Sequence, residues 1–155
     1  MSLNKIIIGF IIVLLIFSGI IVLQINKNPA PKSKVVIDNH FFDVEVASTS
    51  AQQQLGLSGR DSLAQERGML FVFKKPGYYP FWMKGMKFPL DIIFINNNKI
   101  VSIEQNAPLT SGSDEKNFPI YTPDAPAIEA LEVNGGITKG YGIQKGDDVK
   151  IMLNP

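Results

Sequence analysis

The chain has no cysteine, a single histidine and few recognisable catalytic motifs. The lack of cysteine excludes disulfides, thiolate zinc sites and cysteine nucleophiles. The one histidine, His40, excludes a metal site built on two or more histidines, and its Asp38-Asn39-His40 context is typical of a surface turn. A phosphate-binding glycine loop, G-x-S-x-G and H-E-x-x-H are also missing. We therefore expect no bound metal and no cofactor.

A concentrated basic face is missing as well. The 15 Lys and Arg residues nearly balance the 14 Asp and Glu residues, so the net charge is +1. The basic residues before Val35 are lysines without any acid among them, and every acid lies from Asp38 onward. The part that follows Val35 is thus slightly acidic, whereas nucleic-acid modules usually carry a basic face. We expect no nucleic-acid partner.

The longest hydrophobic run, residues 6–25, contains no charged residue. As a helix it would be about 30 Å long, which matches the hydrocarbon core of a bilayer. It exceeds the apolar core of about 7–15 residues of a cleavable signal peptide, and no convincing cleavage site follows. We therefore expect residues 1–25 to be a single membrane anchor, which can also be described as an uncleaved signal. The alternative is a signal peptide that is cleaved.

The orientation of this anchor is less strongly indicated. Lysines flank the run on both sides, and the positive-inside rule taken literally mildly favours a cytoplasmic domain. A single N-terminal anchor with a small domain behind it usually exports that domain. We therefore expect a single-pass protein of the cell membrane with its domain on the extracytoplasmic face.

Residues 26–34 form a proline-containing polar linker, and residues 35–155 form the domain. Short apolar or alternating segments, separated by turn residues, recur through the domain. They predict an all-β sandwich or barrel of about seven or eight short strands. The segments are 35–37, 42–46, 68–73, 81–86, 91–95, 99–103, 127–133 and 149–153.

One short helix is expected within residues 48–60. Thr49 or Ser50 can cap its N-terminus, and Gln52 or Gln53 can complete a capping box. Gly56 is expected to end the helix in a left-handed turn, which glycine adopts without steric cost. A helical turn is also expected over residues 137–142.

The stretch from Phe81 to Ile95 combines the only tryptophan, Trp82, with a dense apolar run and one acid, Asp91. A carboxylate in such surroundings costs several kcal/mol unless it is paired or hydrogen-bonded. Asp91 is therefore either a satisfied structural group or the floor of a site.

Five spaced motifs resemble the DUF192 family in the same order. They are GLSGR (56–60), GMLFVF (68–73), FWMKGMKFPLDIIFI (81–95), ALEVNGG (130–136) and GIQKGDDV (142–149). The resemblance implies a small β-sandwich-like domain, often placed behind a signal or anchor, and implies no established activity. The chain departs from the family pattern at Ser58, where methionine is usual, and at Gly85, where asparagine is common. The residues that match include Arg60, Gly68, Trp82, Met83, Pro89, Asp91, Glu132, Gly135, Gly146 and Asp147.

Two carboxylates and a tryptophan are the only constellation that suggests a site. In one hypothesis the chain is a binding or interaction module of the cell envelope, with a cleft in which acids and the indole ring suit a sugar. In the other it is a hydrolase that uses Asp91 and Glu132 as a general acid/base pair. The structural alternative is that Arg60 neutralises one or both acids inside the core. The candidate ligand-binding residues are Arg60, Trp82, Met83, Lys84, Asp91 and Glu132.

Overall fold

The computed structural model describes residues 33–110 and 115–154. These residues belong to one compact unit that spans Lys32–Pro155. The expected membrane anchor (residues 1–25) and residues 26–32 of the expected linker lie outside the described residues. None of the helices in the described ranges is long and apolar enough to span a bilayer.

The described chain is mostly β with short helices, as the pattern of short alternating segments predicts. In chain order its elements are β1 (Ser33–Ile37), β2 (His40–Ala47), α2 (Ser50–Leu55), β3 (Arg67–Gly77), β4 (Leu90–Asn96), β5 (Lys99–Ala107), η1 (Glu115–Asn117), β6 (Ala127–Asn134), α3 (Ile137–Tyr141) and β7 (Val149–Met152).

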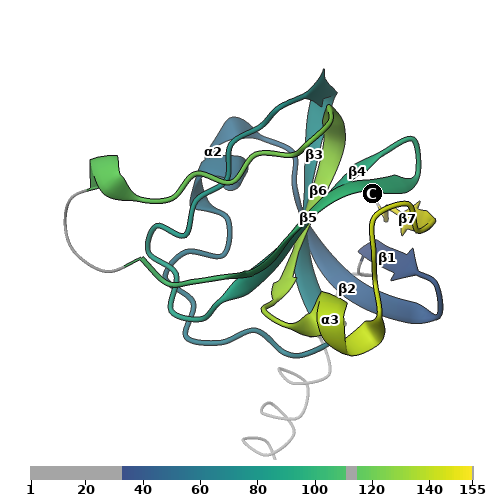
Figure 1. Cartoon of the computed structure of the whole chain (residues 1–155), viewed down its shortest axis with the longest axis horizontal. Coiled ribbons are helices and arrows are strands. Elements are labelled where there is room, and N and C mark those ends of the chain that lie inside the picture. The colour runs from purple at the N-terminus through teal and green to yellow at the C-terminus, as the bar shows by residue number, and fades with distance from the viewer. Residues whose placement is uncertain (1–32, 111–114, 155) are drawn as a thin grey trace, which may run out of the picture. The chain divides into compact units, whose positions relative to one another are not determined.

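The strands form a single curled sheet in the order β5-β4-β6-β3-β2-β1-β7 (Figure 1). Its two edges meet at one corner, where the Ile100 N–H donates to the Asp147 carbonyl (3.0 Å) and the Val149 N–H donates to the Asn98 carbonyl (2.8 Å). The fold is therefore a half-barrel, which selects the barrel-like form of the expected architecture over two sheets packed as a sandwich.

Strands β1 and β2, and strands β4 and β5, form hairpins, and their turn residues explain them. Asn97 and Asn98 both have positive φ (50° and 59°) between β4 and β5, as a two-residue hairpin turn requires. Asp38 has a φ of 51° between β1 and β2. Strand β1 begins at Ser33, which pairs with Val44, so the last two residues of the expected linker belong to the sheet.

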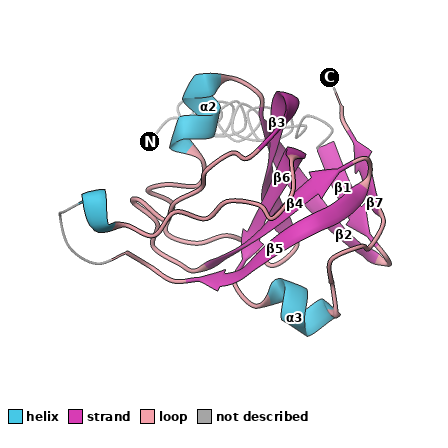
Figure 2. Cartoon of the chain, turned by 45° about the horizontal axis from the view of Figure 1, so that its top comes forward, coloured by secondary structure: helices cyan, strands magenta, loops and turns pink. Residues whose placement is uncertain are grey.

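The two sides of the sheet carry different apolar cores. The inner core lies inside the curl and draws on Val35, Phe42, Leu70, Ile93, Leu131, Val133, Ile137 and Val149. The outer core draws on Leu57, Met69, Phe71, Phe81, Met83, Ile92, Phe94 and Ala130. Figure 2 shows α2 above the strands and α3 below them. Helix α3 supplies Ile137 to the inner core, and the residues after α2 supply Leu57 to the outer core.

Helix α2 has the predicted capping box and lies within the expected range of residues 48–60. The Gln52 N–H donates to Thr49 Oγ1 (3.3 Å), and the Thr49 N–H donates to Gln52 Oε1 (3.0 Å). The helix ends at Gly56 as predicted, but the φ of 53° and ψ of −136° of this residue differ from the expected left-handed turn and suit only glycine. The expected strand over residues 81–86 is wrong. Only Phe81 forms a bridge, with Tyr121, and the chain then turns through Gly85 at a φ of 69°.

Gly68 permits the close approach of β3 to β6. A Cβ at this position would lie 2.7 Å from the backbone oxygen of Glu132, which cannot move aside as a flexible side chain can. We expect Gly68→Ala to destabilise the domain by about 1–3 kcal/mol, as overpacked cores do. Denaturant unfolding measures this, with Gly140→Ala in α3 as the control, because a Cβ there meets nothing within 4 Å. Equal stability of the two variants would contradict the prediction.

Candidate ligand-binding site

Asp91 lies in β4, is fully buried and is a satisfied structural group. Its Oδ1 accepts the backbone N–H groups of Asn106 (2.7 Å) and Gly136 (2.9 Å). Its Oδ2 accepts the backbone N–H and the hydroxyl of Thr138, both at 2.7 Å. The carboxylate thus joins β4 to the end of β5 and to the first turn of α3. Both carboxylate oxygens therefore have hydrogen-bond donors. Of the two interpretations that the sequence allows, Asp91 is the satisfied structural group and not the floor of a site.

Asp91 and Glu132 project from opposite sides of the sheet. The β4–β6 register pairs Asp91 with Val133 and Ile92 with Glu132. Directly paired residues share a face and successive residues alternate. Accordingly, Val133 belongs to the inner core and Ile92 to the outer core. The hypothesis of an acid/base pair is therefore wrong, because such a pair must flank one open pocket at about 5–10 Å.

Glu132 is a buried acid without compensation. Only 5% of its surface is exposed, and its register neighbours on the outer side are Met69 in β3 and Ile92 in β4. Among the described residues, Oε2 has no hydrogen-bond partner. Burial raises the pKa of Glu132 from 4.5 to about 8, so its carboxyl is largely protonated at neutral pH. A desolvated acid of this kind at a cleft is a candidate functional group.

A cleft with a volume of about 390 Å³ opens beside Glu132. One wall is α2 with the residues that follow it, and the other is the aromatic loop of residues 78–86. A Cβ added to Gly56 would lie 3.8 Å from Glu132 Oε2, so the end of α2 closes over the carboxyl. The apolar lining consists of Leu55, Leu57, Phe71, Phe73, Tyr79, Pro80, Phe81, Trp82, Met86 and Ile120.

Most polar groups of the cleft are already engaged within the protein. Gln53 Nε2 donates to the carbonyls of Ala47 (3.3 Å) and Val72 (2.9 Å). The Ser58 hydroxyl donates to the Lys84 carbonyl (2.8 Å), and the Tyr79 hydroxyl donates to the Lys75 carbonyl (2.8 Å). The Glu132 carboxyl and the exposed Gln54 amide are thus the polar side-chain groups that the cleft offers to a ligand. This inventory does not suit a sugar, which brings many hydroxyl groups.

Trp82, Met83 and Lys84 play three different parts. Trp82 is 39% exposed and lines the cleft, as the sequence predicts. Met83 is fully buried in the outer core and supports the loop from beneath. Lys84 Nζ lies 5.2 Å from the centroid of the Trp82 ring, a cation–π contact on the rim. Lys84 and Trp82 also border a second hollow of about 440 Å³, together with Leu55 and Ser58.

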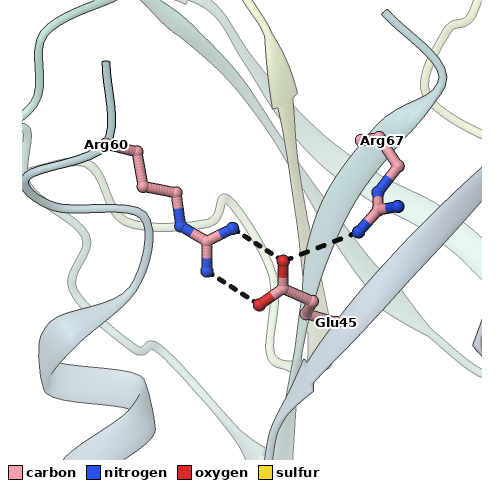
Figure 3. A network of polar contacts seen from close by, with 3 residues as sticks. All are labelled: Glu45, Arg60 and Arg67. Atoms are coloured by element: carbon pink, nitrogen blue, oxygen red, sulfur yellow. Dashed lines mark hydrogen bonds and ion pairs between the residues drawn. The ribbon is translucent and has the colours of Figure 1, made fainter. Parts of the chain in front are cut away.

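Arg60 pairs with an acid that the sequence does not single out. Its Nη1 and Nη2 atoms donate to the two carboxylate oxygens of Glu45 in β2, at 2.6 and 2.7 Å (Figure 3). Arg67 Nη2 lies 3.8 Å from Glu45 Oε1 on the other side. Arg60 is thus a bidentate partner for a carboxylate, but the alternative in which it neutralises Asp91 or Glu132 is wrong. All three side chains are partly exposed, and such pairs contribute about 0–1 kcal/mol.

Ser58 and Gly85, the two residues that depart from the family pattern, lie next to each other in the structure. A Cβ added to Gly85 would be 3.4 Å from the Cβ of Ser58, and both residues line the second hollow. A side chain as large as methionine at position 58 would occupy this space. The small residues at both positions therefore leave the second hollow open beside Trp82.

Several cleft residues escape the sequence analysis. Phe71 and Phe73 belong to β3, where the GMLFVF run indicates only a buried strand. Ile120 lies far away in sequence, in a segment without periodicity. The alternation of side chains along β3 could have identified Phe71 and Phe73. It places them, with Met69, on the same side of the sheet as Glu132 once β3 and β6 are known to pair. Within the described ranges, no cluster of three His, Asp or Glu side chains is arranged to hold a metal.

The comparisons with known proteins identify a family and two related structures. The profile of DUF192, described as an uncharacterized ACR, matches residues 33–151. A crystal structure from Novosphingobium aromaticivorans, described as a protein of unknown function, is 34% identical, with a TM-score of 0.68, and the match covers 77% of this chain and 83% of that one. A crystal structure from Sinorhizobium meliloti, described as a putative transcription regulator, is 30% identical, with a TM-score of 0.67, and the match covers 77% of this chain and 92% of that one.

A comparison with curated proteins gives no match. Because the family profile extends from the first strand to the last, and because both related structures share the curled sheet, the chain belongs to the DUF192 family.

Proposed function

We propose that this protein is a binding module whose ligand enters the cleft beside Glu132. The observation that carries the proposal is the buried carboxyl with an unpartnered Oε2 at the wall of an aromatic cleft. Burying a polar group without a hydrogen bond costs about 1–3 kcal/mol in proteins, and a ligand that supplies the missing partner recovers part of that cost. The size and the apolar lining are those of small-molecule sites.

The proposed site differs from the one expected at the sequence level. Trp82 and Glu132 remain in it, Lys84 lies on its rim, and Asp91, Met83 and Arg60 serve the fold around it. The hydrolase alternative is not proposed, because Asp91 lies on the far side of the sheet. We retain as part of the proposal that residues 6–25 tether the domain to the cell membrane and that the domain works on the extracytoplasmic face. The uncharged run and the linker behind it support this tether.

A fragment screen tests the binding function. Trp82 is the only tryptophan of the chain and lines the cleft, so its fluorescence reports on occupancy. We expect small ligands with an apolar body to change this fluorescence in the full chain. Ile120→Ser removes apolar surface from the rim and should weaken such a ligand about fivefold. Phe41→Ser is the matched control, because Phe41 is similarly exposed (49% against 55%) and lies outside the cleft.

Two outcomes would overturn the proposal. One is a screen in which no fragment alters the Trp82 signal. The other is a ligand whose affinity falls equally in the Ile120→Ser and Phe41→Ser variants, because that ligand would bind elsewhere.

A further inference from the structure

We infer that the cleft binds a protonated amine with an apolar body, whose ammonium group lies against the Glu132 carboxyl and whose body lies against the aromatic walls. This inference rests on the proposed function, because it assigns a ligand class to the same cleft. Its geometric basis is the buried Oε2 of Glu132, which lacks a hydrogen-bond donor among the described residues. An ammonium N–H supplies that donor and a complementary charge together.

The charges that line the cleft favour a cation over an anion. Among the described residues that line the cleft, Glu132 is the one carboxyl, and none is a lysine, arginine or histidine. An anionic ligand would bury its charge without any basic group among the described lining residues to offset it. A ligand with many hydroxyl groups would leave most of them unpaired, since Gln53, Ser58 and Tyr79 already donate to backbone carbonyls.

The aromatic walls also suit a cation with an apolar body. Phe73 and Tyr79 stack at 3.7 Å between ring centroids, and Phe71 meets Phe81 edge to face at 5.0 Å. The faces of such rings carry partial negative charge and attract ammonium groups. Trp82 shows this preference within the protein, because Lys84 Nζ lies 5.2 Å from its ring. Aromatic rings and a lone carboxyl together form a site for an organic cation.

Binding of an amine should displace the proton of Glu132. The carboxyl, whose pKa is raised to about 8, holds its proton at pH 7 in the empty cleft. An ammonium group beside it favours the carboxylate, so one proton leaves when the ion pair forms. The affinity for an amine should therefore rise roughly tenfold from pH 6 to pH 7. The affinity for a neutral ligand should not change.

Other titratable groups on this side of the sheet do not account for such a pH dependence. Burial is the cause of the raised pKa of Glu132, and no neighbouring charge contributes to it. The groups that face the outer side from neighbouring elements have partners of their own. They are the Glu45, Arg60 and Arg67 network, Asp43 with Lys34, Tyr79 with the Lys75 carbonyl, and Lys84 with Trp82. Glu104 also faces this side, where its charge helps to raise the pKa of Tyr121.

The test compares three ligands that share a phenyl group and differ in charge. The full chain is titrated with 2-phenylethylamine, 2-phenylethanol and 3-phenylpropanoate, and the fluorescence of Trp82 is followed. We expect the amine to bind roughly tenfold tighter than the alcohol, and the anion to bind most weakly. Only the amine should show the rise in affinity from pH 6 to pH 7.

Two glutamates of β6 provide the variant and its control. Glu132→Gln keeps the shape of the side chain and removes its ability to ionise when an amine binds, so we expect it to weaken the amine roughly thirtyfold and to abolish the pH dependence. Glu129→Gln makes the same change on the inner side of the sheet, where Glu129 pairs with Ile95, and should leave both unchanged.

The outcomes separate the inference from the proposed function. Equal affinities for amine and alcohol, or an amine affinity that survives Glu132→Gln, would overturn the amine inference and leave a cleft that binds other ligands. If none of the three phenyl ligands alters the Trp82 signal, the amine inference fails. If the wider fragment screen is silent too, the binding function fails with it.

Discussion

Replacing Asp91 with asparagine is expected to destabilise the domain by about 3–5 kcal/mol, the cost of breaking a buried network of hydrogen-bonded charge. The carboxylate accepts hydrogen bonds from Asn106, Gly136 and Thr138 at both oxygens. Asparagine replaces one of these oxygens with an NH₂ group, which places a hydrogen-bond donor opposite N–H groups that are also donors. At least one buried N–H then loses its acceptor, at the full cost of its desolvation. Urea unfolding of the full chain, followed by Trp82 fluorescence, measures the loss.

Asp61→Asn is the control for this experiment. It makes the same chemical change at an exposed side chain, whose partner is Lys87 at 2.6 Å. An exposed pair of this kind contributes about 0–1 kcal/mol, so the control should unfold close to the wild type. Comparable stability of the Asp91→Asn and Asp61→Asn variants would show that the network around α3 does not stabilise the fold.

Replacing Glu132 with glutamine is expected to have the opposite effect, and one that depends on pH. Burial raises the pKa of Glu132 from 4.5 to about 8, so the folded state binds its proton more tightly than the unfolded state does. Below pH 4.5 both states are protonated and the wild type has no penalty. As the pH rises from 4.5 to 8, the unfolded state ionises first, and the folded state loses stability. The loss approaches about 5 kcal/mol, at about 1.4 kcal/mol per pKa unit.

Glu132→Gln removes this titration and should leave a flatter profile of stability against pH. The amide adds a buried donor, which costs a constant amount at all pH values, so the slope between pH 4.5 and pH 8 is the diagnostic quantity. Glu129→Gln is the control on the same strand. Burial also raises the pKa of Glu129, but this side chain is only partly buried, so its variant should flatten the profile less. A wild-type stability that does not fall over this range would contradict the description of Glu132 as a desolvated acid.

The two acid variants also distinguish the roles of the two acids. Asp91→Asn removes a structural contact and should impair folding before any ligand is considered. Glu132→Gln should remain folded, and at pH 8 should be more stable than the wild type, while it loses its affinity for an amine. A residue kept at a cost to stability in a cleft is the usual sign of a functional site.

The local features of this protein are encoded in short stretches of its sequence. The Asn97-Asn98 turn, the capping box of Thr49 and Gln52, and the end of α2 at Gly56 all follow from preferences of a few adjacent residues. The alternation of β6 also places Glu132 on one face with Ala130. The segment of residues 81–86 is the exception, since its apolar character reflects packing against the outer core and a wall of the cleft rather than a strand.

The roles of Asp91 and Glu132 depend on which strands become neighbours in the sheet, and the sequence does not reveal that arrangement. Strand β6 inserts between β4 and β3, and the register that results sends Asp91 into the inner core and Glu132 into the outer cleft. The same non-local pairing brings Glu45 of β2 to Arg60. The spacing of residues along the chain carries no information on these distances, since each is set by the pairing of strands remote in sequence.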